Sequence, residues 1–332
     1  MMGELSIPLP AGYRVRDVLA FHSRDAEGVA ERIAEHGLRK GILLGGVPVL
    51  IEIDFHREET ESTALCRILP DSALTAAQQQ AVQDALLNML GLRIDPAAFA
   101  DFARADPVLG PLLARQPGLR IVQSATVFEA LTWAIIGQQI NLGFAIALRR
   151  TLIQLAGRPH SSGLWCYPEA SDVARLQLED LTSRKFSRAK AETVLRLARL
   201  VDEGKLSLAR ERDPMEVSRE LLAVKGIGPW TVNYALLRGY GYPDCSLHGD
   251  VAVKRGRTSP KPNACWSATS RTGPWPPPTS GPASATRLAE LSSSAAGLRT
   301  AALLLPRTGS ARPRARWPGY PGRNAPRARW ES

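Results

Sequence analysis

The stretch that decides the fold is MEVSRELLAVKGIGPWTVNYALLRGYGYPDCSLHGDVAVKR, residues 215–255. It starts with helical spacing, and the Lys-Gly-Ile-Gly sequence at 225–228 then predicts a tight hairpin. Pro229 suits the first position of a second helix, which we expect to end near Arg238 with Gly239 as its C-terminal cap. Glycines let the backbone turn sharply and approach a ligand closely, and the amides of such a hairpin suit a phosphate.

Residues 108–256 are expected to form a helical unit around this hairpin. The run FEALTWAIIGQQINLGFAIALRRTLIQLAG begins after a capping-box pattern, Thr126 with Glu129. It is too apolar for a surface helix, so we expect one central helix, or two helices broken near 137–141. A further helix fits residues 185–203.

Residues 1–107 have the pattern of a small mixed α/β domain. Two β-rich runs, KGILL and VPVLIEIDF, surround a Gly-Gly turn at 45–46, and STALCRIL follows as a third strand. Helical spacing occurs over 25–36 and 74–91. The sequence therefore predicts an α+β protein, in which a small sheet with helices on one face precedes a helical domain.

The basic charge of the chain is concentrated at its end. The formal net charge is +10, yet residues 251–332 hold 14 Lys and Arg against two acids, Glu290 and Glu331. The preceding 250 residues hold 28 bases and 30 acids. Overall basicity therefore does not support DNA binding by the body of the protein, and that inference has to come from local motifs.

Residues 257–332 differ in kind from the rest. They contain 12 of the 25 prolines and no Asp, and no helical or strand period persists in them. One interpretation is a disordered basic tail. The other is a frame-shifted translation, because a shifted frame across 256–283 can encode a string with acids, bases and apolar residues at helical spacing.

Composition also limits the compartment and the chemistry. No apolar stretch is long enough for a membrane span, and the first residues lack the pattern of a secretion signal, so we expect a cytoplasmic protein. Cys66, Cys166, Cys245 and Cys265 have no C-x-x-C spacing. We expect reduced structural thiols, no iron–sulfur cluster and no metal site.

Taken alone, a helix pair joined by glycines is most often an ordinary structural turn. However, residues 221–255, together with IIGQQIN at 135–141, strongly resemble the helix-hairpin-helix DNA glycosylases. Within that superfamily the chain is most similar to the alkylation-repair branch, DNA-3-methyladenine glycosylase II. The resemblance extends over roughly 1–255, and implies an α/β N-terminal domain followed by a helical domain.

This resemblance implies an activity. The family hydrolyses the N-glycosidic bond of alkylated purines such as 3-methyladenine and 7-methylguanine in duplex DNA, flips the base out of the stack, and leaves an abasic site. Duplex DNA with alkylated bases is then the partner, and we expect a monomer that needs no cofactor. The alternative is a non-catalytic helix-hairpin-helix DNA-binding protein, or an inactive glycosylase with a decayed C-terminus.

The resemblance also assigns the residues that act on the nucleotide. Asp250 matches the catalytic aspartate, while Trp230 and Tyr234 match aromatic positions of the base pocket, which Phe21 would close. Trp230 and Tyr234 are four residues apart, so they share a helix face, and aromatic faces suit a cationic alkylated base. Without the motif, such a pair is more often core, and Asp250 could be a helix N-cap.

A second set of residues is assigned to the DNA backbone and the stack. Gly226 and Gly228 match the hairpin that holds a phosphate, in the family often with a monovalent cation on backbone carbonyls. Gln138 and Gln139 lie in the segment that enters the minor groove, and Gln139 matches the wedge that fills the gap of the flipped nucleotide. Without the motif, these glutamines could be polar residues at a helix end.

One position separates the branches of the superfamily. In the bifunctional glycosylase/lyases a lysine stands where this chain has Trp230, and its amine forms a Schiff base with the sugar. An indole cannot do so. We therefore expect a monofunctional hydrolase.

Overall fold

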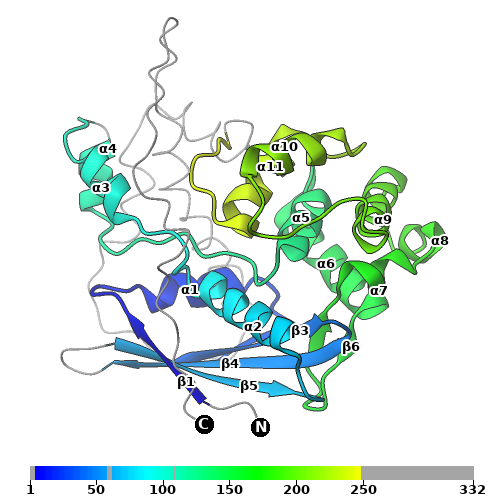
Figure 1. Cartoon of the computed structure of the whole chain (residues 1–332), viewed down its shortest axis with the longest axis horizontal. Helices are drawn as coiled ribbons and strands as arrows, with labels where there is room; N and C mark the ends of the chain where they lie inside the picture. Colours follow the sequence, from blue (N-terminus) through cyan, green and yellow to red (C-terminus); the bar gives the residue numbers. More distant parts are fainter. Residues whose placement is uncertain (1–3, 58–61, 108, 248–332) are drawn as a thin grey trace, which may run out of the picture.

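The computed structural model describes residues 4–57, 62–107 and 109–247. Asp250 and the predicted tail at 257–332 lie outside the described residues. Within those residues the chain forms one sheet, two helices across a face of it, and a group of helices beyond (Figure 1). No helix in this part is both long and apolar enough to cross a membrane.

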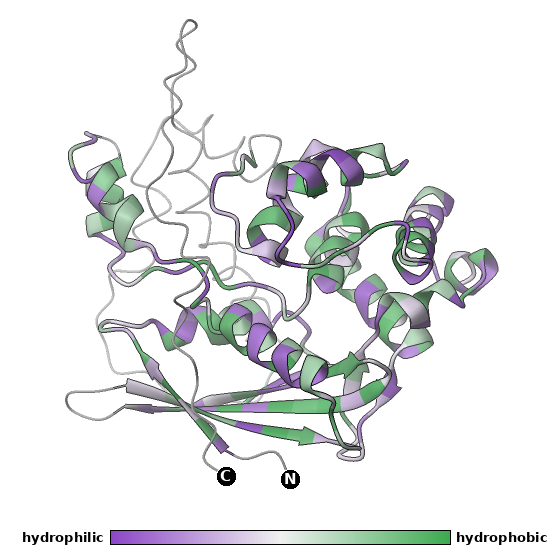
Figure 2. Ribbon diagram, viewed as in Figure 1, coloured by the Kyte–Doolittle hydropathy of each residue, from purple (hydrophilic) through white to green (hydrophobic). Residues whose placement is uncertain are grey.

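The sheet has the strand order β1-β5-β4-β3-β7-β6, and β2 also pairs with β3. Its strands are β1 (Glu4–Leu9), β2 (Glu31–Ile33), β3 (Gly37–Leu44), β4 (Val47–Arg57), β5 (Ser62–Pro70), β6 (Arg158–Pro159) and β7 (Trp165–Tyr167). All neighbours are antiparallel except β3 and β7. Apolar residues follow the central strands in Figure 2 and form the core beneath the helices.

The predicted hairpin and third strand are confirmed. Gly45 and Gly46 have φ values of 55° and 78°, in the left-handed region that this two-residue turn requires, and they join β3 to β4. The helix predicted at 74–91 is α2 (Ala76–Met89), which Thr75 caps. It lies with α1 (Val15–His22) across one face of the sheet (Figure 1).

The helix predicted at 25–36 is wrong. Gly28 takes a φ of 60° in a turn, and the chain then extends as β2 along β3. The carboxylate of Glu31 is buried in a pairing with Lys40 of β3 and Arg149 of a later helix. These long-range contacts outweigh the local helical spacing.

The rest of the described chain is mostly helical. Its helices are α3 (Ala97–Ala103), α4 (Leu109–Ala114), α5 (Val127–Ile136), α6 (Leu142–Ala156), α7 (Ala170–Ala174), α8 (Leu178–Thr182), α9 (Arg188–Asp202), α10 (Pro214–Ala223), α11 (Pro229–Ala235) and a π-helical turn η1 (Leu236–Tyr240). The predicted break near 137–141 is confirmed, because α5 ends before it and Asn141 caps α6. The core helix α5 is buried on nearly every side, as its apolar sequence predicted.

Two details of the helical prediction are wrong. The region is not all-helical, because β7 pairs in parallel with Gly41 and Ile42 of β3 and so extends the N-terminal sheet. The chain continues from α11 into η1, and the left-handed cap is Gly241 at the end of η1, with a φ of 74°, and not Gly239. Gly239 instead permits close packing on α5, since a Cβ there would lie 3.2 Å from that of Ala130.

Cys66, Cys166 and Cys245 are free thiols in the described part of the chain, as expected for reduced structural cysteines. Burial raises the pKa of the Cys66 thiol to about 12 and the pKa of the Cys166 thiol to about 11. Both therefore stay protonated at neutral pH and are poor nucleophiles.

Candidate active site

The hairpin between α10 and α11 has two glycines in different situations. Gly226 has a φ of 98°, and a Cβ there would lie 2.0 Å from the Oγ1 of Thr193 on α9. Glycine at this position is therefore required by the fold itself. A Cβ on Gly228 would meet nothing within 4 Å, so this second glycine leaves open space beside the backbone.

The structure brings the predicted wedge segment against the hairpin. The side-chain amide of Gln138 donates to the carbonyl of Gly226 at 3.2 Å and to the hydroxyl of Thr231 at 2.9 Å. The ammonium group of Lys190 donates to the carbonyl of Gln138. Gln139 is exposed at the end of α5 with a φ of 56°, a strained value for a residue with a side chain. The two predicted DNA-binding segments thus form one surface.

The hairpin carbonyls do not fit a bound cation well. The carbonyl of Lys225 accepts from the guanidinium of Arg196 at 2.9 Å, and the carbonyl of Gly226 accepts from Gln138. The carbonyl of Val224 accepts from the amide of Ile227 at 3.0 Å. The guanidinium of Arg196 at the Lys225 carbonyl places positive charge where a cation would bind, and two like charges in contact repel.

The predicted aromatic pair forms. The rings of Trp230 and Tyr234 lie 5.4 Å apart between centroids and at 33° to one another. They belong to a cluster with Ala134 and Leu247, against which Trp133 of α5 also packs. The indole nitrogen Nε1 of Trp230 is buried and finds no hydrogen-bond acceptor among the described residues. A buried donor without an acceptor costs free energy, which a ligand acceptor could recover.

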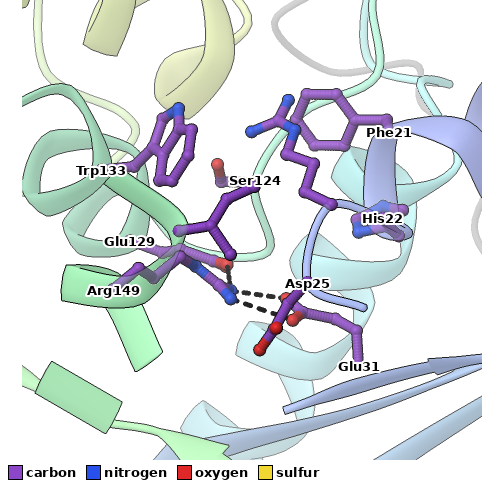
Figure 3. Close-up of a pocket in the computed structure, with 10 residues that line it drawn as sticks. Phe21, His22, Asp25, Glu31, Ser124, Glu129, Trp133 and Arg149 are labelled. Carbon is purple, nitrogen blue, oxygen red and sulfur yellow. Dashed lines mark hydrogen bonds and ion pairs between the residues drawn. The ribbon is translucent and has the colours of Figure 1, made fainter. Parts of the chain in front are cut away.

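The resemblance predicts that Phe21 of α1 closes the pocket around this pair. Phe21 lines a pocket with Trp133 of α5, and the described residues that line this pocket do not include Trp230 or Tyr234 (Figure 3). Trp133 is therefore the residue shared between the pocket at Phe21 and the aromatic pair.

Glu31, Lys40, Glu129 and Arg149 form a buried charge cluster. Three of these residues, Glu31, Glu129 and Arg149, line this pocket. Lys40 lies 2.5 Å from Glu31 and 2.7 Å from Glu129. Arg149 contacts the same two carboxylates at 2.6 and 2.8 Å (Figure 3). Two cations and two anions balance here. Burial alone would raise the pKa values of Glu31 and Glu129, but Arg149 and Lys40 outweigh it and hold both below the usual range.

His22 lies at the edge of the same pocket and is fully buried. Its Nε2 lies 3.4 Å from the carbonyl of Met89. Burial, with the nearby charge of Lys40, lowers the pKa of His22 to about 3. The imidazole is therefore neutral at physiological pH.

Among the described residues that line this pocket, the sequence predicted only Phe21, and the residues that it missed include Arg24, Trp133 and the buried carboxylate of Glu129. The capping prediction for Glu129 was only partly correct, since its backbone amide donates to the Thr126 hydroxyl but its carboxylate joins the charge cluster. One signal was available for Trp133, because it stands one helical turn after Glu129 on an otherwise apolar helix.

Comparison with curated proteins finds relatives named as DNA-3-methyladenine glycosylases. Over 253 residues the chain is 27% identical to DNA-3-methyladenine glycosylase of Bacillus subtilis, a match that covers 74% of this chain and 82% of the relative. Over 169 residues it is 30% identical to DNA-3-methyladenine glycosylase 2 of Escherichia coli, a match that covers 50% of this chain and 60% of the relative. The chain is a relative of the DNA-3-methyladenine glycosylases. No family model matches it.

Solved structures of DNA glycosylases share the fold of this chain. The 3-methyladenine DNA glycosylase of Archaeoglobus fulgidus aligns with a TM-score of 0.64 and 22% identity, over 89% of this chain and 94% of that one. The 8-oxoguanine glycosylase/lyase of Clostridium acetobutylicum, solved with double-stranded DNA, aligns with a TM-score of 0.57 and 14% identity over 91% and 94% of the two chains. The predicted resemblance and the mixed α/β architecture are thereby confirmed.

Proposed function

We propose that this protein is a monofunctional DNA glycosylase that removes alkylated purines from duplex DNA and leaves an abasic site. The observation that carries the proposal is the joining of the Gly226–Gly228 hairpin to the Gln138–Gln139 segment, with the Trp230–Tyr234 pair on the following helix. The named relatives support the same activity. We propose the division into an α/β domain at 1–107 and a glycosylase domain at 108–256, although β7 ties the two together.

Each part of this surface has a role in holding the DNA. The open backbone at Gly228 would receive a phosphate, because no side chain keeps an oxygen away from its amide. The exposed Gln139 would enter the stack where the nucleotide has left it. Duplex DNA is the partner, the enzyme acts as a monomer without a cofactor, and a cytoplasmic location stays a prediction.

The aromatic cluster supplies recognition of damage. Alkylation at a ring nitrogen makes a purine cationic, which improves both its departure and its contact with aromatic faces. The Trp230 and Tyr234 rings offer such faces. Selection by stacking would admit several alkylated purines.

The chemical step would use Asp250, which lies outside the described residues. As the bond between C1′ and the base nitrogen breaks, the bonding electrons leave with the base and positive charge develops on the sugar. The Asp250 carboxylate would stabilise this charge and orient a water molecule. The water oxygen then bonds to C1′ and releases a proton to solvent. Trp230 has no amine, so no Schiff base forms with the sugar.

The decisive experiment measures release of free 3-methyladenine and 7-methylguanine from methylated duplex DNA. We expect Asp250→Asn to lower the rate by about a hundredfold or more through loss of charge stabilisation. Affinity for duplex DNA should change by less than about twofold, because the hairpin surface is intact.

The alternative, a DNA-binding protein without activity, gives a different result. Both the parent chain and the Asp250→Asn variant would then bind DNA in a salt-sensitive manner and release no base. If a chain with the restored frame after residue 255 were also silent, only this alternative would remain.

A further inference from the structure

Arg24 occupies the aromatic pocket described above. Its guanidinium carbon lies 3.8 Å from the ring centroid of Phe21 and 5.2 Å from that of Trp133. Figure 3 shows these two rings on opposite sides of the pocket. Both distances are within the range of a cation–π contact, so one planar cation bridges two aromatic walls.

Every other charged group that lines the pocket is balanced by a partner. Glu31, Glu129 and Arg149 belong to the buried charge cluster. Asp25 lies 2.5 Å from Arg150 of α6, and the adjacent His22 is neutral at physiological pH. Among the described residues, no carboxylate lies within ion-pair distance of Arg24. Its partners there are the two aromatic faces.

We propose that Arg24 is an internal plug, which holds the Phe21–Trp133 slot in the free protein and leaves it when a planar cationic base enters. This inference rests on the proposed function, since the base it names is an alkylated purine. The site itself is a binding slot for planar cations in general.

The physical reason is the similarity of the two occupants. A guanidinium and an alkylated purine are both flat, positively charged and able to stack on aromatic rings. Like charges at contact repel, so a cationic base that enters the slot displaces Arg24. The guanidinium of Arg238 also lies 5.1 Å from the Phe21 ring centroid, but it donates to the carbonyl of Val122. A cationic base regains the cation–π contact that Arg24 gives up, whereas an undamaged neutral purine does not. The plug therefore weakens binding of every base and weakens binding of neutral bases most.

The test measures binding of the free nucleosides N7-methylguanosine and guanosine to the full chain at pH 6, where the methylated ring is cationic. Calorimetry should show that Arg24→Ala binds N7-methylguanosine about tenfold more tightly than the parent, the equivalent of one released cation–π contact. Guanosine affinity should change less. Arg24→Gln should show the same direction, and equal melting temperatures would show that each variant is folded.

Two controls make the result specific. Arg16→Ala removes an equal charge from the preceding helix α1, where the Arg16 side chain is 81% exposed, and should bind like the parent. Adding Trp133→Leu to Arg24→Ala should abolish the gain. Unchanged, weaker or undetectable binding of N7-methylguanosine by folded Arg24→Ala would overturn the plug.

The outcome is separable from that of the proposed function. Tighter nucleoside binding by Arg24→Ala, with no base release from DNA by the parent chain or by a chain with the restored frame after residue 255, would support the slot and reject the glycosylase. Base release by the parent chain, with no gain in nucleoside binding, would reject the plug alone.

Discussion

The hairpin and the buried charge cluster hold the same helix, α5, by different means. At its C-terminal end, neutral hydrogen bonds from Gln138 and backbone geometry at Gly226 attach α5 to the hairpin. Near its N-terminal end, Glu129 attaches α5 to the sheet through Lys40. The hairpin end is exposed and held by neutral groups, whereas the cluster end is buried and charged, although the paired residues are 88 and 89 positions apart in the sequence. We therefore expect the loss of one charge at the cluster end to destabilise the protein more than the loss of one hydrogen bond at the hairpin end.

The largest effect is expected from Glu129→Gln. The amide keeps the shape but leaves Lys40 and Arg149 with one carboxylate between them in a buried site. Such an imbalance should lower the free energy of unfolding by about 3–5 kcal/mol. Urea denaturation measures this value.

The matched control is Glu192→Gln, which removes a carboxylate 2.9 Å from Arg188 in an exposed pair. That change should cost about 0.5 kcal/mol or less. Equal losses in the two variants would show that burial of the cluster is not what makes it sensitive.

The two hairpin glycines should differ when each is replaced by alanine. Gly226→Ala forces a side chain onto Thr193 at a positive φ and should cost about 2–4 kcal/mol, part of which Thr193→Ala restores. The Cβ of Gly228→Ala meets only open space, so the stability of this variant should fall by less than about 1 kcal/mol, the cost of alanine at the N-cap of α11. Its affinity for duplex DNA should nevertheless fall about tenfold, if one phosphate hydrogen bond is lost. Unchanged affinity would mean that DNA does not approach this amide.

Acid should weaken the cluster end of α5. The pKa of His22 is about 3 in the folded protein, against 6.5 for the ordinary group, so between these values the unfolded chain binds the extra proton. Stability should fall as pH decreases from 6 to 4, by about 1.4 kcal/mol per pH unit from this group. His22→Gln should flatten that slope in urea titrations at several pH values. A slope identical to that of the parent would assign the acid sensitivity to other groups.

Only a small change in stability is expected from Gln139→Gly, and its sign is opposite to the effect on activity. Glycine accepts the φ of 56° without strain, so stability should rise by about 0.5–1 kcal/mol. Base release should fall, since the wedge side chain is gone. Thermal unfolding measures the expected rise in stability, and the base-release assay measures the expected fall in activity. A variant that is more stable and fully active would exclude Gln139 as the wedge.

Features set by neighbouring residues were predictable from the sequence. The Gly45-Gly46 turn, the Pro229 helix start and the break before Asn141 all depend on backbone preferences of a few adjacent residues. The pairing of Trp230 with Tyr234 depends only on helical spacing.

Features set by distant partners were not predictable. Glu31 joins a strand because Lys40 and Arg149 pair with its carboxylate, and the local helical spacing around Glu31 does not indicate these partners. The same holds for Arg24, whose aromatic partner Trp133 is far along the chain. A single sequence shows these residues but not that they meet.

The parallel pairing of β7 with β3 has a consequence for synthesis of the chain. One edge of β3 is shared between β2, along residues 38–40, and β7, along Gly41 and Ile42. As the ribosome releases the protein, the second half of that edge has no partner until residues 165–167 emerge. An open strand edge can pair with other strands, so this part of the sheet is completed only after the helices between the two strands have been made.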